Sequence, residues 1–157
     1  MTKEDTVSVL NDLIETCRNG EYGFRTASEH VQNSQLATMF DEYATQRSGF
    51  TRALQAEVER LSGTPVESGT LMGTLHRGWI DLKSAFSGGD AGSIVAACET
   101  GEQSAVAAYE RAADHTDLTG EARAIVDKQF RSVQEAHNRL VRLRDEISNG
   151  VEYPKTE

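Results

Sequence analysis

The stretch VSVLNDLIETCRNGEYGFRTASEHV, residues 7–31, carries its apolar side chains at steps of three and four residues. This period predicts an amphipathic helix with one buried stripe. Glu21 falls within the stripe, where an unpaired carboxylate would be costly to bury. It ends a Cys-x-x-Gly-Glu pattern at residues 17–21, and the same pattern recurs at 98–102, ending on Glu102. Two carboxylates at matching places in two helical stretches indicate a polar site between facing helices.

Helical period extends over the rest of the chain, and no stretch shows the apolar–polar alternation of a β-strand. Apolar stripes predict further long helices at about residues 34–61, 90–114 and 119–148, and a shorter one at about 68–86. Ser34 is a suitable N-cap for the second helix, and the run SGTP at residues 62–65 is typical of its end. The sequence therefore predicts an all-α fold.

The lengths of the connections predict how these helices are ordered in space. A few residues separate the first helix from the second and the fourth from the fifth, so each pair is expected to form an antiparallel hairpin. A segment of about thirty residues lies between the hairpins, and such a crossover is the topology of ferritin-like bundles. We expect a ferritin-like four-helix bundle of two antiparallel hairpins, with a long crossover carrying a short fifth helix. It forms one domain over residues 1–150, followed by a flexible C-terminal tail at 151–157.

The composition limits the classes of function. The chain has 157 residues and a formal net charge of −9, which argues against a nucleic-acid partner and against an anionic membrane surface. No apolar run is long enough to span a membrane, and the first residues, MTKED, lack the apolar core of a signal peptide. With two cysteines and no export signal, we expect a cytoplasmic protein with reduced thiols.

Three parts of the sequence resemble a known family. They are LNDLIETC at residues 10–17 followed by GEYGF at 20–24, the run LHRGWIDLK at 75–83, and Gly101-Glu102 with Tyr109. Over about residues 5–147 the chain resembles bacterial ferritin-like four-helix-bundle proteins of unknown function, and HRGWIDLK is the most specific piece of the resemblance. The resemblance implies a ferritin-like fold in a small bacterial cytoplasmic protein linked to stress responses. It implies no established activity.

The metal ligands of a ferritin-like fold are incomplete in this chain. Ferritin-like di-iron proteins place a Glu on each of two helices and a Glu-x-x-His on each of the other two. Glu21 and Glu102 match the single carboxylates, whereas the second helix offers Arg47 and the last helix offers Gln134-x-x-His137. We therefore expect no cofactor. The alternative is iron or another divalent metal held by Glu21, Glu102 and His137.

Arg47 lies on the apolar stripe of the second helix, where it supplies a fixed positive charge. Arginine suits a buried, bidentate pair with a carboxylate. We predict that Arg47 pairs with Glu21, Glu102 or both, and that His137 completes this polar layer by hydrogen bonding. Such a layer would specify the register of the helices more than it adds stability.

Other chemistry-bearing residues have ordinary structural interpretations. Cys17 and Cys98 are expected to fill small spaces in the core, with a thiolate metal site or a redox pair as the alternative. Tyr43 and Tyr109 are expected to be core aromatics whose hydroxyls reach the polar layer. Trp79 is expected to anchor the crossover onto the end of the bundle.

Three functions remain open on the sequence alone. The first is a non-catalytic, stress-associated bundle whose di-iron site is degenerate and is replaced by an Arg47–carboxylate layer. The second is a metal-binding protein or oxidoreductase that uses Glu21, Glu102 and His137. The third is a protein-interaction module that acts through a homodimer or a partner, which the sequence does not identify.

Overall fold

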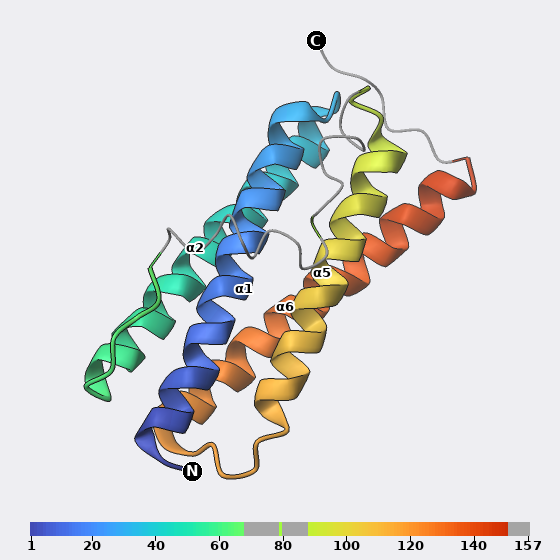
Figure 1. Cartoon of the computed structure of the whole chain (residues 1–157). Coiled ribbons are helices and arrows are strands. Elements are labelled where there is room, and N and C mark those ends of the chain that lie inside the picture. Colours follow the sequence, from blue (N-terminus) through green and yellow to red (C-terminus); the bar gives the residue numbers. More distant parts are fainter. Residues whose placement is uncertain (68–78, 80–87, 151–157) are drawn as a thin grey trace.

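The computed structural model describes residues 1–67, Trp79 and residues 88–150. Within these residues the chain forms four helices and no strand, which confirms the all-α prediction. The helices are α1 (Lys3–His30), α2 (Ser34–Arg60), α5 (Ala91–Ala113) and α6 (Gly120–Ser148) (Figure 1). The short helix expected at 68–86 and the tail expected at 151–157 lie outside the described residues. None of the described helices has the length and apolar character needed to cross a membrane.

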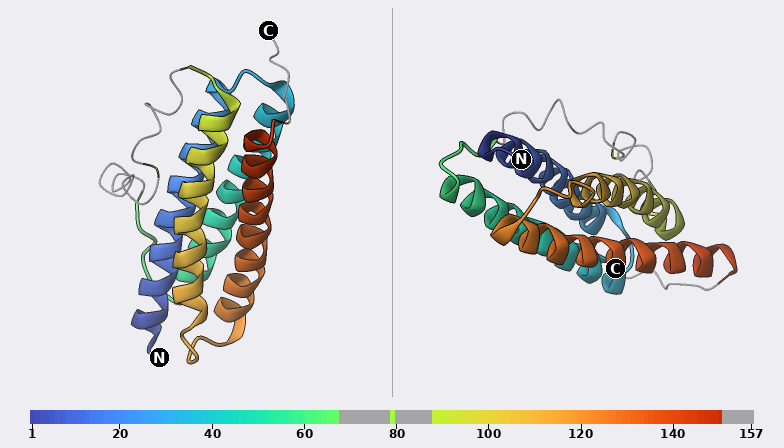
Figure 2. Two further views of the ribbon diagram at one scale, coloured as in Figure 1. Left: turned by 90° about the vertical axis from the view of Figure 1, so that its right-hand side faces the viewer. Right: turned by 90° about the horizontal axis from the view of Figure 1, so that it is seen from below.

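The four helices form two antiparallel hairpins, as the connection lengths predicted. α1 and α2 make one hairpin and α5 and α6 make the other, with α1 beside α5 and α2 beside α6 (Figure 2). The connection after α2 returns the chain to the end of the bundle where α1 stops, since the backbone N–H of Gln32 donates to the carbonyl of Gly89 at 3.3 Å. α2 and α5 therefore run in the same direction, which is the consequence of a long crossover.

Side chains just outside the helices determine where three of them begin. Thr2 and Asp5 form a capping box at the start of α1, in which each side chain accepts from the other residue's backbone N–H. α2 is capped by Asn33, whose Oδ1 accepts from the N–H of Leu36 at 2.9 Å. The cap expected at Ser34 is therefore wrong by one residue, because Ser34 already belongs to the helix. Asp90 caps α5 in the same way as Asn33 caps α2.

The buried apolar residues form two clusters, one toward each end of the bundle. The first contains the α1 residues from Leu10 to Cys17, and the second contains those from Phe24 onward. The remaining members of the first cluster come from α2, α5, α6 and the loop before α6: Leu54, Val58, Ala105, Ala108, Tyr109, Ala112, Leu118, Ala122, Val126 and Val133. Those of the second include Met39, Phe40, Ala44, Trp79, Ile94, Val95, Cys98 and Leu140. A layer of different chemistry separates the two clusters near the middle of the bundle.

The described parts of the crossover lie against α1. Asn11 donates to the carbonyl of Thr64 at 3.1 Å and accepts from the N–H of Val66 at 2.9 Å. Arg18, two turns further along α1, donates to the carbonyl of Val66 at 2.7 Å. The described residues that follow α2 therefore lie near the first half of α1, whereas Gly89, just before α5, lies near its end.

Trp79 is 4% exposed and lies in a notch between α1 and α5. A Cβ atom on Gly23 would lie 2.3 Å from the indole ring, and one on Gly101 would lie 2.1 Å from it. The ring also meets Phe24 edge-on, with 5.3 Å between ring centroids. Gly101 is near the middle of α5, so Trp79 docks beside the middle of this helix and not at the end of the bundle, where it was expected.

Replacing Gly23 by alanine is expected to destabilise the protein by ~1–3 kcal/mol, because the new methyl group overlaps the Trp79 ring. Gly49→Ala in α2 is the matched control, since only the end of the Arg52 side chain comes within reach of its Cβ, at 3.8 Å. This control should gain up to about 1 kcal/mol from helix propensity. Urea unfolding followed by circular dichroism measures both, and equal effects of the two variants would contradict the packing described.

A candidate functional site built on a buried arginine–glutamate pair

Arg47 of α2 and Glu102 of α5 form a bidentate ion pair in the middle of the bundle. Nη1 of Arg47 donates to Oε1 of Glu102 at 2.6 Å, and Nη2 donates to Oε2. The side chains are 1% and 0% exposed, so both charges are removed from water. The pair lies between the two apolar clusters and is the layer that separates them.

The surroundings of Arg47 hold the guanidinium in one position. Gly20 of α1 faces it, and a Cβ atom on Gly20 would lie 3.4 Å from Nη1 and 3.6 Å from Cγ. The guanidinium carbon is 5.4 Å from the centroid of the Phe24 ring, within the range of a cation–π interaction. Nε donates to Oε1 of Gln46 at 3.2 Å. Hydrogen bonds thus engage every nitrogen of the buried guanidinium.

Glu102 stabilises the positive charge of the buried Arg47. Burial alone would lower the pKa of Arg47, but the charge and hydrogen bonds of Glu102 outweigh it and raise the pKa above the ordinary value. Arg47 donates to both oxygens of Glu102, so the nearest positive charge to this carboxylate is already supplied by the protein. The pair therefore acts as a fixed structural charge layer.

A second polar element lies next to the ion pair and joins all four helices. The hydroxyl of Tyr109 in α5 donates to Oε1 of Gln129 in α6 at 2.7 Å, and its oxygen is 3.0 Å from the sulfur of Cys17 in α1. Nε2 of Gln129 donates to the carbonyl of Phe50 in α2 at 3.3 Å. Because the hydroxyl proton goes to Gln129, the Cys17 thiol is the donor to Tyr109.

Both cysteines are buried free thiols, as their expected role in the core requires. Burial raises the pKa of Cys17 to about 11, and the pKa of Cys98 lies well above its ordinary value for the same reason, with Glu102 adding to the shift. Burial also raises the pKa of Tyr109 well above its usual range. Protonated thiols are weak nucleophiles and poor metal ligands. The pair Cys17–Tyr109 is therefore a hydrogen bond between neutral groups.

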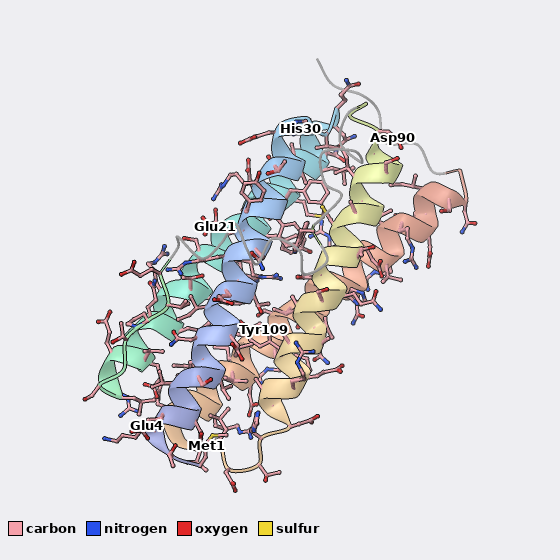
Figure 3. The ribbon with its side chains drawn as sticks, viewed as in Figure 1. Met1, Glu4, Glu21, His30, Asp90 and Tyr109 are labelled. Carbon is pink, nitrogen blue, oxygen red and sulfur yellow. The ribbon has the colours of Figure 1, made fainter. Side chains whose placement is uncertain are left out.

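Glu21 lies apart from the ion pair. Its side chain is 34% exposed, and its Oε2 is 3.7 Å from Nη2 of Arg25, one turn further along α1. Figure 3 labels Glu21 on the α1 ribbon, further toward the end of that helix than the level of Tyr109. The residue of α1 that faces Arg47 is Gly20, so of the two predicted partners Arg47 contacts Glu102. The repeated Cys-x-x-Gly-Glu pattern thus gives one buried and one half-exposed carboxylate.

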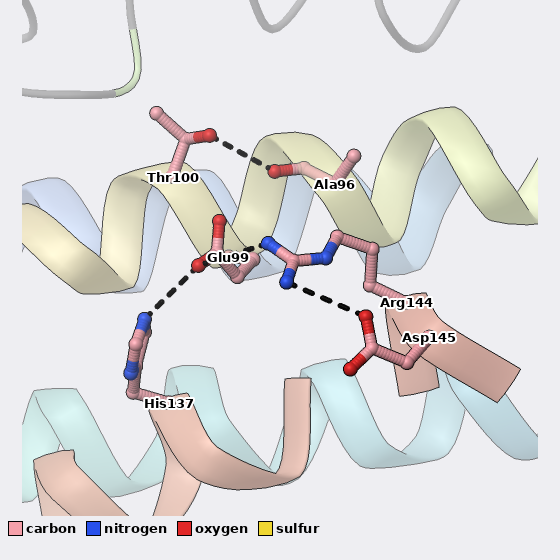
Figure 4. A network of polar contacts seen from close by, with 6 residues as sticks. All are labelled: Ala96, Glu99, Thr100, His137, Arg144 and Asp145. Atoms are coloured by element: carbon pink, nitrogen blue, oxygen red, sulfur yellow. Dashed lines mark hydrogen bonds and ion pairs between the residues drawn. The ribbon is translucent and has the colours of Figure 1, made fainter. Parts of the chain in front are cut away.

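His137 contacts a different carboxylate, at the edge of the α5–α6 interface (Figure 4). Its Nε2 is 3.1 Å from Oε1 of Glu99, and Nη1 of Arg144 is 3.3 Å from the same oxygen. Arg144 also reaches Asp145 at 3.4 Å. Glu99 is one turn before Glu102, so His137 lies near the height of the ion pair but outside it. Gln134 is exposed on the surface of α6.

Glu21, Glu102 and His137 are therefore not brought together. The inward side of α6 near this height carries Ala136, flanked by Val133 and Leu140. Across residues 1–67, Trp79 and 88–150, no group of three or more His, Cys, Asp and Glu side chains is arranged to hold a metal ion.

Sequence inspection missed Gln129 as part of the site. It is 3% exposed and lies three residues after Val126 on the apolar stripe of α6. A polar residue on an otherwise apolar stripe was the available signal, the same signal that identified Arg47. The notch around Trp79 gave no comparable signal, since Gly23 and Gly101 come from different helices.

Comparison with known proteins agrees with this architecture. The family described as a domain of unknown function (DUF2383) matches residues 5–115, which include nearly all of α1 and the whole of α2 and α5. A search of curated proteins found no significant match.

Two solved structures share the fold. A dodecameric thioferritin, the bacterioferritin-related protein of Bacteroides fragilis, is 16% identical, with a TM-score of 0.82 over 95% of this chain and 89% of that one. A two-domain protein of Anabaena variabilis, with DJ-1/ThiJ/PfpI-like and ferritin-like domains, is 18% identical with a TM-score of 0.74. All of this chain is covered in the second comparison, but it spans 41% of that protein's length. These likenesses confirm the ferritin-like fold predicted from the sequence.

Replacing Arg47 by methionine is expected to cost ~3–5 kcal/mol, because it leaves the buried Glu102 carboxylate without a partner. The double variant Arg47→Met/Glu102→Met removes both charges and should return to within about 1 kcal/mol of the wild type. Arg25→Met is the control, since its exposed ion pairs are worth less than about 1 kcal/mol. Urea unfolding at pH 7 measures all three. A double variant as unstable as Arg47→Met would show that the charges are not the cause.

The buried Cys17 thiol is expected to make the protein less stable as the pH rises from 9 to 11. Over most of this range the folded thiol, with its pKa of about 11, keeps its proton while the unfolded thiol, with its ordinary pKa of 9.0, ionises. The contribution is complete below pH 9 and has fallen by about 2 kcal/mol at pH 11. The free energy of unfolding of wild type minus that of Cys17→Ala should fall by this amount between pH 8 and 11. A difference that does not change with pH would contradict a raised thiol pKa.

Proposed function

This chain belongs to the family of domains of unknown function DUF2383, and we propose that it is a non-catalytic, stress-associated ferritin-like bundle with a degenerate di-iron site. In this proposal the Arg47–carboxylate layer stands in place of the metal centre. The observation that carries it is the bidentate pair of Arg47 with Glu102, buried between α2 and α5.

The side chains in the middle of the bundle do not fit a di-iron centre. Such a centre takes carboxylates from all four helices and histidines from two of them. At the height of the ion pair the interior receives Gly20 from α1, Arg47 from α2, Glu102 from α5 and Ala136 from α6. One carboxylate remains, and it is neutralised by a guanidinium 2.6 Å away. A cation so close would repel a metal ion at the same place in this poorly solvated interior.

A metal-binding or oxidoreductase function through Glu21, Glu102 and His137 is the alternative, with iron or another divalent metal as cofactor. It would require three present contacts to break. Glu102 would have to leave Arg47, Glu21 would have to leave Arg25, and His137 would have to leave Glu99. Breaking the buried pair would leave an unpaired Arg47 in the core, which is the larger cost. The contacts of all three residues therefore favour the non-catalytic function.

A role as an interaction module is a second alternative, and one comparison favours it. The structural neighbour from Bacteroides fragilis is described as a dodecamer. A bundle without a metal centre could function by self-association, as a homodimer or a larger assembly. It could also function by binding a protein partner. We place the protein in the cytoplasm in each case, since both of its thiols are free. Size-exclusion chromatography with light scattering tests this alternative, and a strict monomer without a co-purifying protein would count against it.

Protein purified from cells supplied with iron and zinc is expected to contain no stoichiometric metal by elemental analysis. The same protein titrated anaerobically with Fe(II) should give no saturable heat. Glu102→Ala and Glu99→Ala serve as the two comparison variants, one in the ion pair and one outside it. Stoichiometric metal in the wild type that is lost in Glu102→Ala but kept in Glu99→Ala would overturn the proposal in favour of the metal-binding alternative.

A further inference from the structure

We propose that the notch between Gly23 of α1 and Gly101 of α5 is a binding site for a planar aromatic ring of the indole class. The chain fills the notch with its own Trp79. When that side chain is removed, free indole takes its place. This site does not depend on the proposed function or on whether the protein binds a metal ion.

The shape of the notch is set by the absence of two side chains. The atoms that a Cβ on Gly23 would meet are Cε3, Cζ3 and Cδ2 of the indole, at 2.3–2.6 Å, and those near Gly101 are Cε2, Cδ2 and Cζ2, at 2.1–2.5 Å. Real Cβ atoms do not approach other atoms so closely. The space between the two helices at this level therefore exists only because neither position has a side chain, and it holds the six-membered part of the indole ring.

Among the described residues, the ring also has aromatic and apolar neighbours. Phe24 meets the indole at an interplanar angle of 73°, which is the edge-to-face geometry that aromatic pairs favour. Trp79 belongs to the packed cluster that also contains Phe40 and Cys98. A flat ring of this size gains both apolar burial and a directed ring contact here. Aliphatic groups of similar volume would gain only the first.

The site adjoins the ion pair through two consecutive pairs of residues. Gly101 touches Trp79 and the next residue, Glu102, binds Arg47; Gly23 touches Trp79 and the next residue, Phe24, lies under the Arg47 guanidinium. Trp79 thus covers the side of the bundle behind which the buried charges lie. This gives a physical role to the tryptophan of the HRGWIDLK run, the most specific stretch of the sequence.

The direct test is the binding of free indole to Trp79→Gly. Removing a large buried side chain leaves an apolar cavity, and such cavities bind small aromatic molecules. We expect saturable one-to-one binding by calorimetry and a rise in the melting temperature with indole concentration. Cyclohexylmethanol, which is bulky but not planar, should produce a smaller rise. Absence of indole binding to a Trp79→Gly protein with native helix content would overturn the proposal.

The location of the bound ring is tested by restoring a side chain in the notch. Trp79→Gly/Gly101→Ala should lose indole binding, because the new methyl group fills the ring's position. Trp79→Gly/Gly49→Ala carries the same glycine replacement in α2, away from the notch, and should bind indole as Trp79→Gly does. Equal indole binding by the two double variants would place the ring elsewhere and overturn the proposal.

A measurement on variants that keep Trp79 tests whether the indole ring needs the notch. Its result does not depend on whether Trp79→Gly folds. Trp79 is the chain's single tryptophan, so its fluorescence reports this site alone. Gly101→Ala should shift the emission to longer wavelength and increase acrylamide quenching while the far-ultraviolet circular dichroism stays helical. Gly49→Ala should leave the emission unchanged. Emission from Gly101→Ala identical to that of the wild type would show that the ring does not need the notch.

Discussion

The buried pair of Arg47 and Glu102 is the constraint that organises the interior. It divides the apolar core into two clusters, and each cluster packs against one side of a layer that contains two full charges. Taking such charges out of water is costly, and their mutual attraction with good geometry only roughly offsets the cost. The pair is therefore best understood as a determinant of alignment between α2 and α5. A shift of either helix by one turn would bury each charge against hydrocarbon.

The hydrogen bonds from Cys17 through Tyr109 to Gln129 extend this alignment to α1 and α6. Each member is neutral and buried, and each needs its neighbour in one orientation. Together with the ion pair they give the bundle a central section in which polar contacts, and not only apolar packing, determine how the helices face one another. A fold of this kind keeps the ferritin-like arrangement of helices while a guanidinium paired with Glu102 occupies the interior at the position of Arg47.

The helices and their connections could be predicted from the sequence because both depend on local patterns. Apolar spacing identified the four described helices, and the lengths of the links identified the two hairpins. The partner of Arg47 was harder to predict. Consecutive helical residues differ in direction by about 100°, and a wide apolar stripe does not determine which of two neighbouring residues points to the centre of the bundle. Glu21 counted as part of the stripe, yet Gly20 is the residue that faces Arg47. The prediction that His137 joins the polar layer of Arg47 was inaccurate for the same reason. His137 lies at the edge of the stripe and contacts Glu99.

The notch around Trp79 has a further consequence for α5. Gly101 and Glu102 are adjacent, so their Cα–Cβ directions differ by about 100° around the helix axis. One of them must face the indole and the other must face the guanidinium. These two contacts, on different sides of one helix turn, leave a single angle of rotation at which both are made. α5 therefore cannot rotate about its own axis without losing one of these two contacts.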